Sequence, residues 1–192
     1  MDKLSNNLLS GAESFTISNQ PAGFSVIDFW RFQFSNIWDI QDQVAEFIVA
    51  RALGQDMPHN KNGWTLWDIN YCGKRIEVKE TAYYHSWRVA GSVSAQRVFG
   101  IGKAYSRYKD TSSDFQRQND VYVFCLNTGE TREESNPLVL NHWRFWVIPT
   151  ETINRVCGNY KSITLRRLQK LTGLKNGISY NELRASVDEC CK

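Results

Sequence analysis

Apolar residues recur along the chain at two different spacings, and these spacings distinguish helices from strands. From Ile37 to Ile48 the apolar positions lie three or four residues apart, as on one face of a helix. Leu53-Gly54 then supplies a stop signal. The pattern therefore predicts a helix over residues 37–53 that turns its apolar face toward a core.

Short apolar runs bounded by turn residues predict several strands after this helix. The run VYVFCL after Asp120 has almost no polar positions, which is typical of a central strand buried on both faces. Gly73 can take the positive φ that a tight hairpin turn needs. The predicted strands cover residues 64–70, 75–81, 97–102, 120–126 and 144–148. Shorter helices are predicted at residues 27–34, 150–156 and 164–171.

The order of these elements indicates one mixed α/β domain with a leading helix, a strand hairpin, and further strands flanked by helices. A chain of 192 residues suits a single core, and its 42% hydrophobic content excludes a disordered protein. We divide it into a polar, loose N-terminal arm at 1–24, the α/β domain at 25–173, and a C-terminal extension at 174–192.

Composition narrows the choice of partner and compartment only a little. The net charge of +3 weakly favours an anionic partner, although binding depends on local charge. The five cysteines show no zinc-binding spacing, so reduced thiols in a cytoplasmic protein are expected. The N-terminus lacks a signal-peptide pattern, and no apolar run reaches about 18 residues, so no membrane contact is expected.

The most informative segment is the predicted hairpin, WDINYCGKRIEVKE. Glu77 and Lys79 lie two residues apart on a strand and therefore share a face, whereas Ile76 and Val78 point the other way into the core. The hairpin returns this strand beside the one that carries Asp68. Two carboxylates and an ammonium are therefore expected to converge at neighbouring strand ends.

Such a set suits the hydrolysis of phosphodiester bonds with Mg²⁺, for which Mn²⁺ can substitute. Mg²⁺ takes hard oxygen ligands and keeps several waters, so its predicted ligands are Asp68, Glu77 and the backbone carbonyl near Val78. The ion polarises the phosphate and lowers the pKa of a bound water. Lys79 is expected to orient that water or to stabilise negative charge on the phosphate, and the sequence leaves this choice open.

A third catalytic acid is expected from the upstream helix. Glu46 lies in its middle and is the first candidate for a role at the same metal, directly or through water, and Asp42 is the alternative. A simpler interpretation also stays open, because surface strands often alternate charged and apolar residues. In that case Glu77 and Lys79 form an ordinary solvated face.

The hairpin with Asp68 and Glu77-Val78-Lys79 resembles the PD-(D/E)XK restriction-endonuclease-like superfamily. Over residues 25–173 the chain is also similar to a group of uncharacterised bacterial proteins, in sequence segments such as AEFIVARALG and IEVKETAYYHSW. The resemblance implies an αβββαβ core with a central mixed sheet flanked by helices, a Glu from the leading helix, and a metal-dependent nuclease site. Trp67 stands where the superfamily has proline, the most dispensable part of its pattern, and the hairpin is not followed by a clear helix with the Gln and Tyr of exonuclease-type members. The substrate and cleavage mode therefore do not transfer.

Basic and aromatic residues after the hairpin are candidates for contacts with nucleic acid, where they would meet phosphates or stack on bases. One structural alternative is a loop that packs Tyr83 and Trp87 into the core, and another is a solvated basic face. The candidates are Tyr84, His85, Arg88, Arg97 and Lys103.

The first hypothesis is therefore a metal-dependent nuclease that acts on nucleic acid, on DNA rather than RNA. The alternatives are an inactive nuclease-fold module that binds nucleic acid or a protein partner, and an α/β scaffold whose charges are coincidental. The intact Asp68, Glu77 and Lys79 set favours the enzyme, because a binding module has no need of all three. Many nucleases of this type act as dimers, so a homodimer is included among the expectations.

Overall fold

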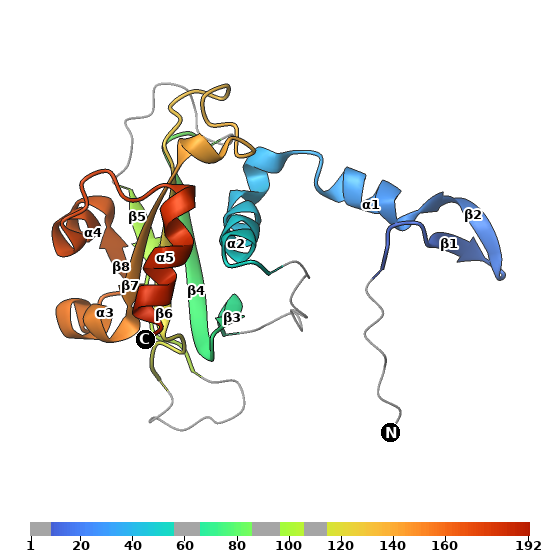
Figure 1. Cartoon of the computed structure of the whole chain (residues 1–192). Helices are drawn as coiled ribbons and strands as arrows, with labels where there is room; N and C mark the ends of the chain where they lie inside the picture. The colour runs from blue at the N-terminus through green and yellow to red at the C-terminus, as the bar shows by residue number, and fades with distance from the viewer. Residues whose placement is uncertain (1–8, 56–65, 86–96, 106–114) are drawn as a thin grey trace, which may run out of the picture.

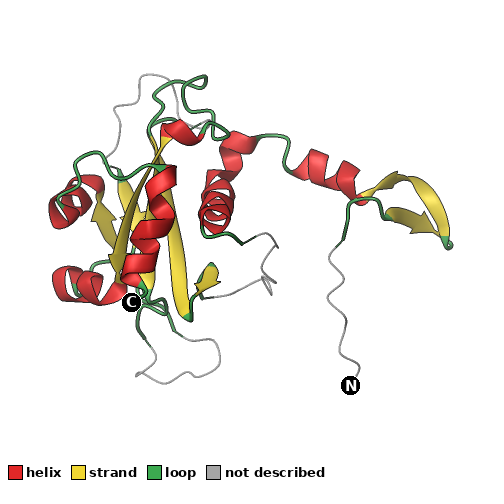
Figure 2. Ribbon diagram, in the orientation of Figure 1, coloured by secondary structure: helices red, strands yellow, loops and turns green. Residues whose placement is uncertain are grey.

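The chain forms a central sheet with helices on both faces (Figure 2). The sheet has four strands in the order β3-β4-β6-β7. Strands β4 and β6 are parallel, whereas β3 and β7 are antiparallel to their neighbours. The strands are β3 (Ile69–Tyr71), β4 (Lys74–Ala82), β6 (Val121–Asn127) and β7 (Trp143–Pro149). This mixed sheet confirms the predicted α/β class. The structure is a computed structural model, and it describes residues 9–55, 66–85, 97–105 and 115–192.

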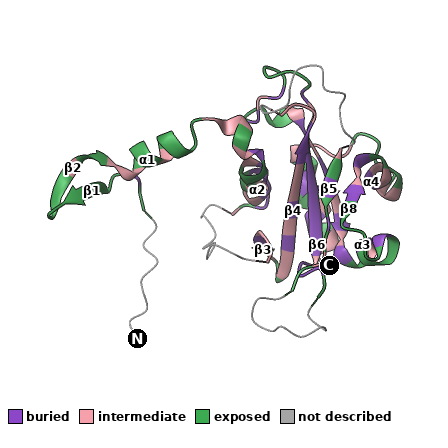
Figure 3. Cartoon of the chain, turned by 180° about the vertical axis from the view of Figure 1, so that it is seen from behind, coloured by how far each residue is buried: buried purple, intermediate pink, exposed green. Residues whose placement is uncertain are grey.

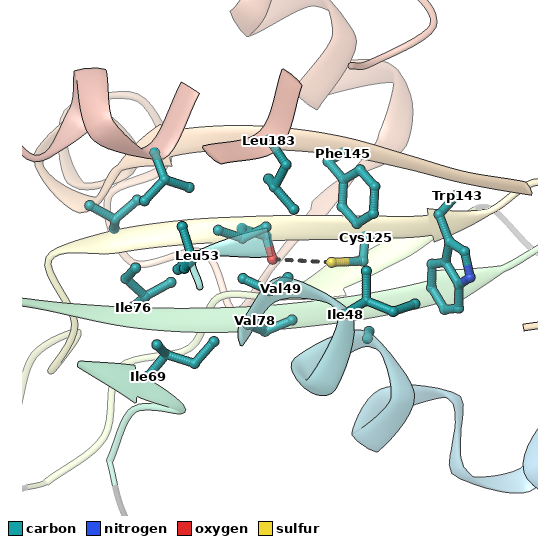
Figure 4. Packing of buried hydrophobic residues seen from close by; sticks show 14 residues of the cluster. Ile48, Val49, Leu53, Ile69, Ile76, Val78, Cys125, Trp143, Phe145 and Leu183 are labelled. Atoms are coloured by element: carbon teal, nitrogen blue, oxygen red, sulfur yellow. Dashed lines mark hydrogen bonds between the residues drawn. The ribbon is translucent and has the colours of Figure 1, made fainter. Parts of the chain in front are cut away.

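One face of the sheet is covered by α2 (Gln41–Ala52) and α5 (Tyr180–Cys190). Figure 4 shows the apolar layer between these helices and the sheet, to which Val78, Phe145 and Leu183 belong. All three side chains are at most 5% exposed. Removal of this apolar area from water is the main force that fixes both helices to the sheet.

The opposite face carries a second apolar layer, under two short helices and a two-stranded ribbon (Figures 1 and 3). Phe124 of the central strand β6 packs edge to face against Phe99 of the ribbon, with 5.1 Å between ring centroids. Strand β6 is therefore buried on both faces, as its apolar run predicted. The covering elements are α3 (Thr150–Cys157), α4 (Leu165–Thr172), β5 (Val98–Gly100) and β8 (Ser162–Thr164).

The hairpin that carries the candidate chemistry has a two-residue turn. Cys72 and Gly73 have positive φ angles of 49° and 76°, the backbone of a type I′ turn, and Tyr71 pairs with Lys74 across it. The predicted turn is thus confirmed, but β3 begins only at Ile69. In the predicted strand over 64–70, residues 66–68 form a bend, and residues 64 and 65 lie outside the described part of the chain.

The single helix predicted over residues 37–53 is in fact two elements. A 3₁₀ turn, η1 (Ile37–Ile40), precedes α2. Ile40 interrupts the helix with φ −120° and ψ 31°. The indole Nε1 of Trp38 in η1 donates to Ser135 Oγ at 3.2 Å, so a contact distant in sequence holds the break in place.

The described part of the N-terminal arm, from residue 9 on, is not loose, and that part of the prediction was wrong. Strands β1 (Ser14–Ile17) and β2 (Gln20–Ser25) form a hairpin that projects from the α/β domain together with α1 (Val26–Gln33) (Figure 1). The turn residues Ser18 and Asn19 have φ angles of 48° and 64°. The turn therefore uses left-handed residues without glycine, and so gives no strong sequence signal.

A capping box opens α1. The backbone N–H and the hydroxyl of Ser25 both donate to Asp28 Oδ2, at 2.8 and 2.7 Å. These bonds lower the pKa of the exposed Asp28 carboxyl. None of the described helices is long and apolar enough to cross a bilayer.

The segment 174–192 contains α5, a helix that the apolar pattern did not predict. Its buried residues are Leu183 and Val187 alone, a signal too sparse to recognise in the sequence. The chain reaches the helix by pairing Ile178 with Phe145 at the edge of β7. Beside this pair a Cβ on Gly177 would lie 2.8 Å from Phe145 O, so the close approach requires glycine.

The burial of α5 predicts that Leu183→Ala lowers the free energy of unfolding by about 2–5 kcal/mol, because it leaves a cavity in the core. Asn181→Ala, on the exposed side of the same helix, is the matched control and should change it by less than about 0.5 kcal/mol. Urea unfolding followed by tryptophan fluorescence measures both. Equal effects of the two substitutions would contradict the packing of α5.

Candidate active site

Strand β4 separates a core-facing side from a side that carries the candidate chemistry. Ile76 and Val78 point into the layer beneath α2 and α5, with 0% and 5% exposure. Glu77 and Lys79 line a cavity on the other face and form an ion pair with each other. Their predicted position on one face of the strand is therefore confirmed.

The carboxylate of Asp68 is fixed at the edge of β4. The register of β3 and β4 would place Asp68 opposite Glu77, but its N–H instead donates to Ile76 O at 2.9 Å. This offset of one residue is what a β-bulge produces, and it re-aims the side chain. Asp68 Oδ2 then accepts the backbone N–H of Val78 at 2.8 Å. The carboxylate thus lies beside the residue that separates Glu77 from Lys79.

The backbone of Val78 presents two groups to this edge. The N–H and C=O of one residue in a strand point to the same side, and the N–H of Val78 points to Asp68. The carbonyl therefore faces the edge that Asp68 occupies. This agrees with the expectation that the Val78 carbonyl lies within reach of an ion held by Asp68.

The cavity beside Glu77 and Lys79 has a volume of about 280 Å³. Gly100 and Gly102 form part of its wall without side chains, and Tyr122 of β6 forms another part. Burial, reinforced by the nearby Glu77 charge, raises the pKa of Tyr122 to about 12. The phenol therefore stays neutral and serves as a hydrogen-bonding wall of the cavity.

A buried arginine holds the far wall of the cavity in place. Arg117 is 5% exposed, and its guanidinium is fully engaged by neighbouring oxygens. The acceptors are Ile101 O at 2.7 Å, Asn154 Oδ1 at 2.7 Å, Gly158 O at 3.0 Å and Tyr160 O at 3.0 Å. Arg117 is therefore a structural residue of the wall rather than a cation that awaits a ligand.

The two acids predicted on the leading helix lie over the opposite face of the sheet. Helix α2 packs on the side of Ile76 and Val78, so Glu46 does not share a face with Glu77 and Lys79. The charges of Glu46 and Asp68 both act on the Cys125 thiol of β6, and a role of Glu46 at the metal stays a prediction. Asp42, the alternative, acts instead on Glu80.

Glu80 is an acid that sequence reasoning missed. Burial, with a smaller contribution from the Asp42 charge, raises its pKa to about 8. Its Oε1 is buried and accepts no hydrogen bond from the described residues. The available signal was the alternation of β4, which places Glu80 on the same side as Ile76 and Val78 and so puts a charge on the core face.

Three of these carboxylates surround Cys125 of β6. Burial raises the pKa of the Cys125 thiol well above its ordinary value, and the charges of Glu80, Asp68 and Glu46 add to the effect. Asp68 thus accepts a hydrogen bond at the edge of β4, between Glu77 and Lys79 in the strand, and its charge also acts on Cys125. Among the described residues, no three Asp, Glu, His or Cys side chains lie close enough together to hold a metal ion by themselves.

The residues predicted to contact nucleic acid have different surroundings. Tyr84 and His85 lie two and three residues after the end of β4 and are half-buried. Arg97 stacks on Tyr83, with its Cζ 4.5 Å from the ring centroid, and its Nη2 donates to Tyr83 O at 3.4 Å. Lys103 Nζ donates to Asn159 Oδ1 at 2.9 Å, and Arg88 lies outside the described residues. Their contact with nucleic acid stays a prediction.

The chain matches no family model, no curated protein and no solved structure with which it was compared. A functional proposal for this chain therefore rests on its own residues, on their geometry, and on the motif resemblance.

The raised pKa of Glu80 predicts a pH-dependent stability. Between its ordinary pKa of 4.5 and the folded-state value of about 8, the folded protein keeps a proton that the unfolded chain releases. The resulting stability is complete below pH 4.5 and is lost as the pH rises through about 8. Glu80→Gln cannot ionise and should be more stable than the unsubstituted protein at pH 9 by at least about 1 kcal/mol.

The measurement is urea unfolding at pH 5 and pH 9 in EDTA. Glu151→Gln, on the exposed side of α3, is the matched control and should follow the unsubstituted protein at both pH values. A difference between Glu80→Gln and the unsubstituted protein that is the same at both pH values would contradict the raised pKa.

Proposed function

We propose that the chain is a divalent-metal-dependent nuclease of the PD-(D/E)XK type that hydrolyses phosphodiester bonds of DNA. The observation that carries the proposal is the 2.8 Å hydrogen bond from the Val78 N–H to Asp68 Oδ2. It places one carboxylate beside a strand whose adjacent residues, Glu77 and Lys79, supply a second carboxylate and an ammonium at a cavity. If Glu77 and Lys79 were only an ordinary solvated face of the strand, the hydrogen bond that holds the Asp68 carboxylate against the backbone of β4 would serve no purpose.

The restriction-endonuclease-like core is part of the proposal. It is supported by the leading helix α2, the hairpin β3–β4, and the parallel strand β6 beside β4. A parallel pair requires a crossover connection, here residues 83–120, of which 86–96 and 106–114 lie outside the described residues. One departure from the expected core is β5, which pairs with β8 rather than joining the central sheet.

The oxygen donors at the edge of β4 fit Mg²⁺ or Mn²⁺. Mg²⁺ usually binds through one or two carboxylates and keeps several waters, so a third acid is not required. Asp68, Glu77 and the Val78 carbonyl would hold the ion. When bound, it would polarise the phosphate and lower the pKa of a water molecule.

Lys79 has the position expected of a residue that stabilises negative charge. Its side chain is 34% exposed, and its ion pair with Glu77 keeps the ammonium at the cavity. A fixed cation beside a phosphate stabilises charge that develops on the non-bridging oxygens, and it needs no reorganisation to do so. This role does not require Lys79 to remove a proton from water.

The proposal predicts that Asp68→Asn and Lys79→Ala each slow cleavage at least about a hundredfold, equivalent to about 2.7 kcal/mol. Asn at position 68 can still accept the Val78 N–H but has no charge, so the substitution separates the metal role from the structural one. Cleavage of plasmid and single-stranded DNA in Mg²⁺, compared with EDTA, is the measurement.

Glu151→Gln, on the exposed side of α3, controls for the loss of an acid elsewhere. Equal cleavage by the unsubstituted protein, Asp68→Asn and Lys79→Ala would show that the activity comes from another site or another protein. Metal binding without cleavage of any substrate would favour the inactive nuclease-fold module.

A further inference from the structure

A second cavity, of about 320 Å³, lies at the carboxyl end of the parallel strands. Tyr83, which follows β4, and Trp146 of β7 form part of its wall, and both pack with the apolar layer under α3 and α4. The cavity is therefore on the same side of the sheet as Glu77 and Lys79. Its rim includes Lys175 from the connection between α4 and α5.

The lining of this cavity is cationic. Its described residues include Arg144, Lys175 and the amides of Gln169 and Asn176, and none of them carries a carboxylate. The nearby Glu182 lies outside the lining, and its pKa is lowered chiefly by hydrogen bonds from Ser179 and to a smaller extent by Arg144. An anionic ligand would therefore meet two cations at close range, with the Glu182 carboxylate outside the cavity.

Arg144 is arranged to bind a phosphate group. Its Nη1 donates to Asn141 O at 2.9 Å and to Trp143 O at 2.7 Å, which fixes the guanidinium plane. Within the described residues, no protein oxygen accepts from its Nε or Nη2. Two parallel N–H groups on one edge of a guanidinium match two oxygens of a phosphate.

The loop that carries Lys175 is held in place by the protein itself. Trp146 Nε1 donates to Leu174 O at 2.8 Å, and Gln169 Nε2 donates to Lys175 O at 2.6 Å. The cavity is thus formed before a ligand arrives, which lowers the entropic cost of binding.

The spacing of the two cavities suits one nucleic-acid strand. Tyr83 lies four residues beyond Lys79 in the chain, or about 13 Å along an extended backbone, a distance that a nucleic-acid strand spans within a few nucleotides. Strand β5 joins the two cavities, because Arg97 at its start stacks on Tyr83 while Gly100 and Gly102 line the first cavity.

We infer that the cavity between β7 and the α4–α5 connection binds a backbone phosphate of the nucleic-acid strand, a few nucleotides from the bond that is cut. This inference rests on the proposed nuclease function. It assigns Arg144 as the bidentate donor and Lys175 as the second cation, and neither residue belongs to the proposed metal site.

Binding of a fluorescein-labelled single-stranded DNA of twenty nucleotides, measured by anisotropy in EDTA, tests the inference without cleavage. Arg144→Gln/Lys175→Gln should bind at least about tenfold more weakly than Arg155→Gln/Lys192→Gln, which removes the same charge from exposed positions elsewhere. The slope of log K against log salt should also fall by about 0.7 for each lost phosphate contact. Equal affinities and slopes would overturn the inference.

A titration with inorganic phosphate separates a strand phosphate from a free one. The Trp146 indole N–H signal in NMR spectra should shift in the unsubstituted protein and stay constant in Arg144→Gln/Lys175→Gln. A phosphate-induced shift with unchanged DNA affinity would overturn the nucleic-acid assignment in favour of a small phosphorylated ligand. Thermal unfolding checks that each variant is folded. If the double variant does not fold, the single substitution Lys175→Gln, at an exposed position, takes its place in both experiments.

Loss of DNA binding in the double variant supports the inference whether or not the protein cleaves DNA. Absence of Mg²⁺-dependent cleavage in the unsubstituted protein, with this binding intact, would count against the nuclease proposal alone. The two proposals can therefore fail separately.

Discussion

The candidate site depends on one hydrogen bond between a side chain and the main chain. Just before β3 begins, the edge of β4 exposes the backbone N–H of Val78, and the Asp68 carboxylate accepts it. This bond holds the carboxylate against β4, at the end of the bend at residues 66–68. With it, an acid is fixed beside Val78, between the two charged residues of the strand, and the mixed sheet behind that strand holds the arrangement rigid.

One side of β4 packs into the core, and the other side carries the candidate catalytic residues. Ile76 and Val78 anchor the strand in the layer that α2 and α5 cover, and their burial keeps Glu77 and Lys79 facing the opposite cavity. Glu80 interrupts this division, because it lies on the core side with a raised pKa. The charges of Glu80 and Asp68 both act on Cys125, so the local electrostatics are sensitive to any divalent cation that binds nearby.

Much of this arrangement follows from residue spacing. The period of two in β4 fixes which residues share a face, and the apolar run of β6 identifies the central strand. Other features depend on contacts between distant residues and leave little trace in a local pattern. Helix α5 is held by two buried residues and the pairing of Ile178 with Phe145, and the face of the sheet on which α2 packs is set by the apolar layer that it shares with Ile76 and Val78.

The most direct test of the account is the location of a bound paramagnetic ion. Mn²⁺ broadens NMR signals of nuclei close to it, and substoichiometric Mn²⁺ should broaden the backbone amide of Val78 and its neighbours Glu77 and Lys79 first. The same titration of Asp68→Asn should leave these signals sharp. Broadening centred on Asp42 and Glu80 instead, or broadening at Val78 that persists in Asp68→Asn, would contradict the placement of the metal at the edge of β4.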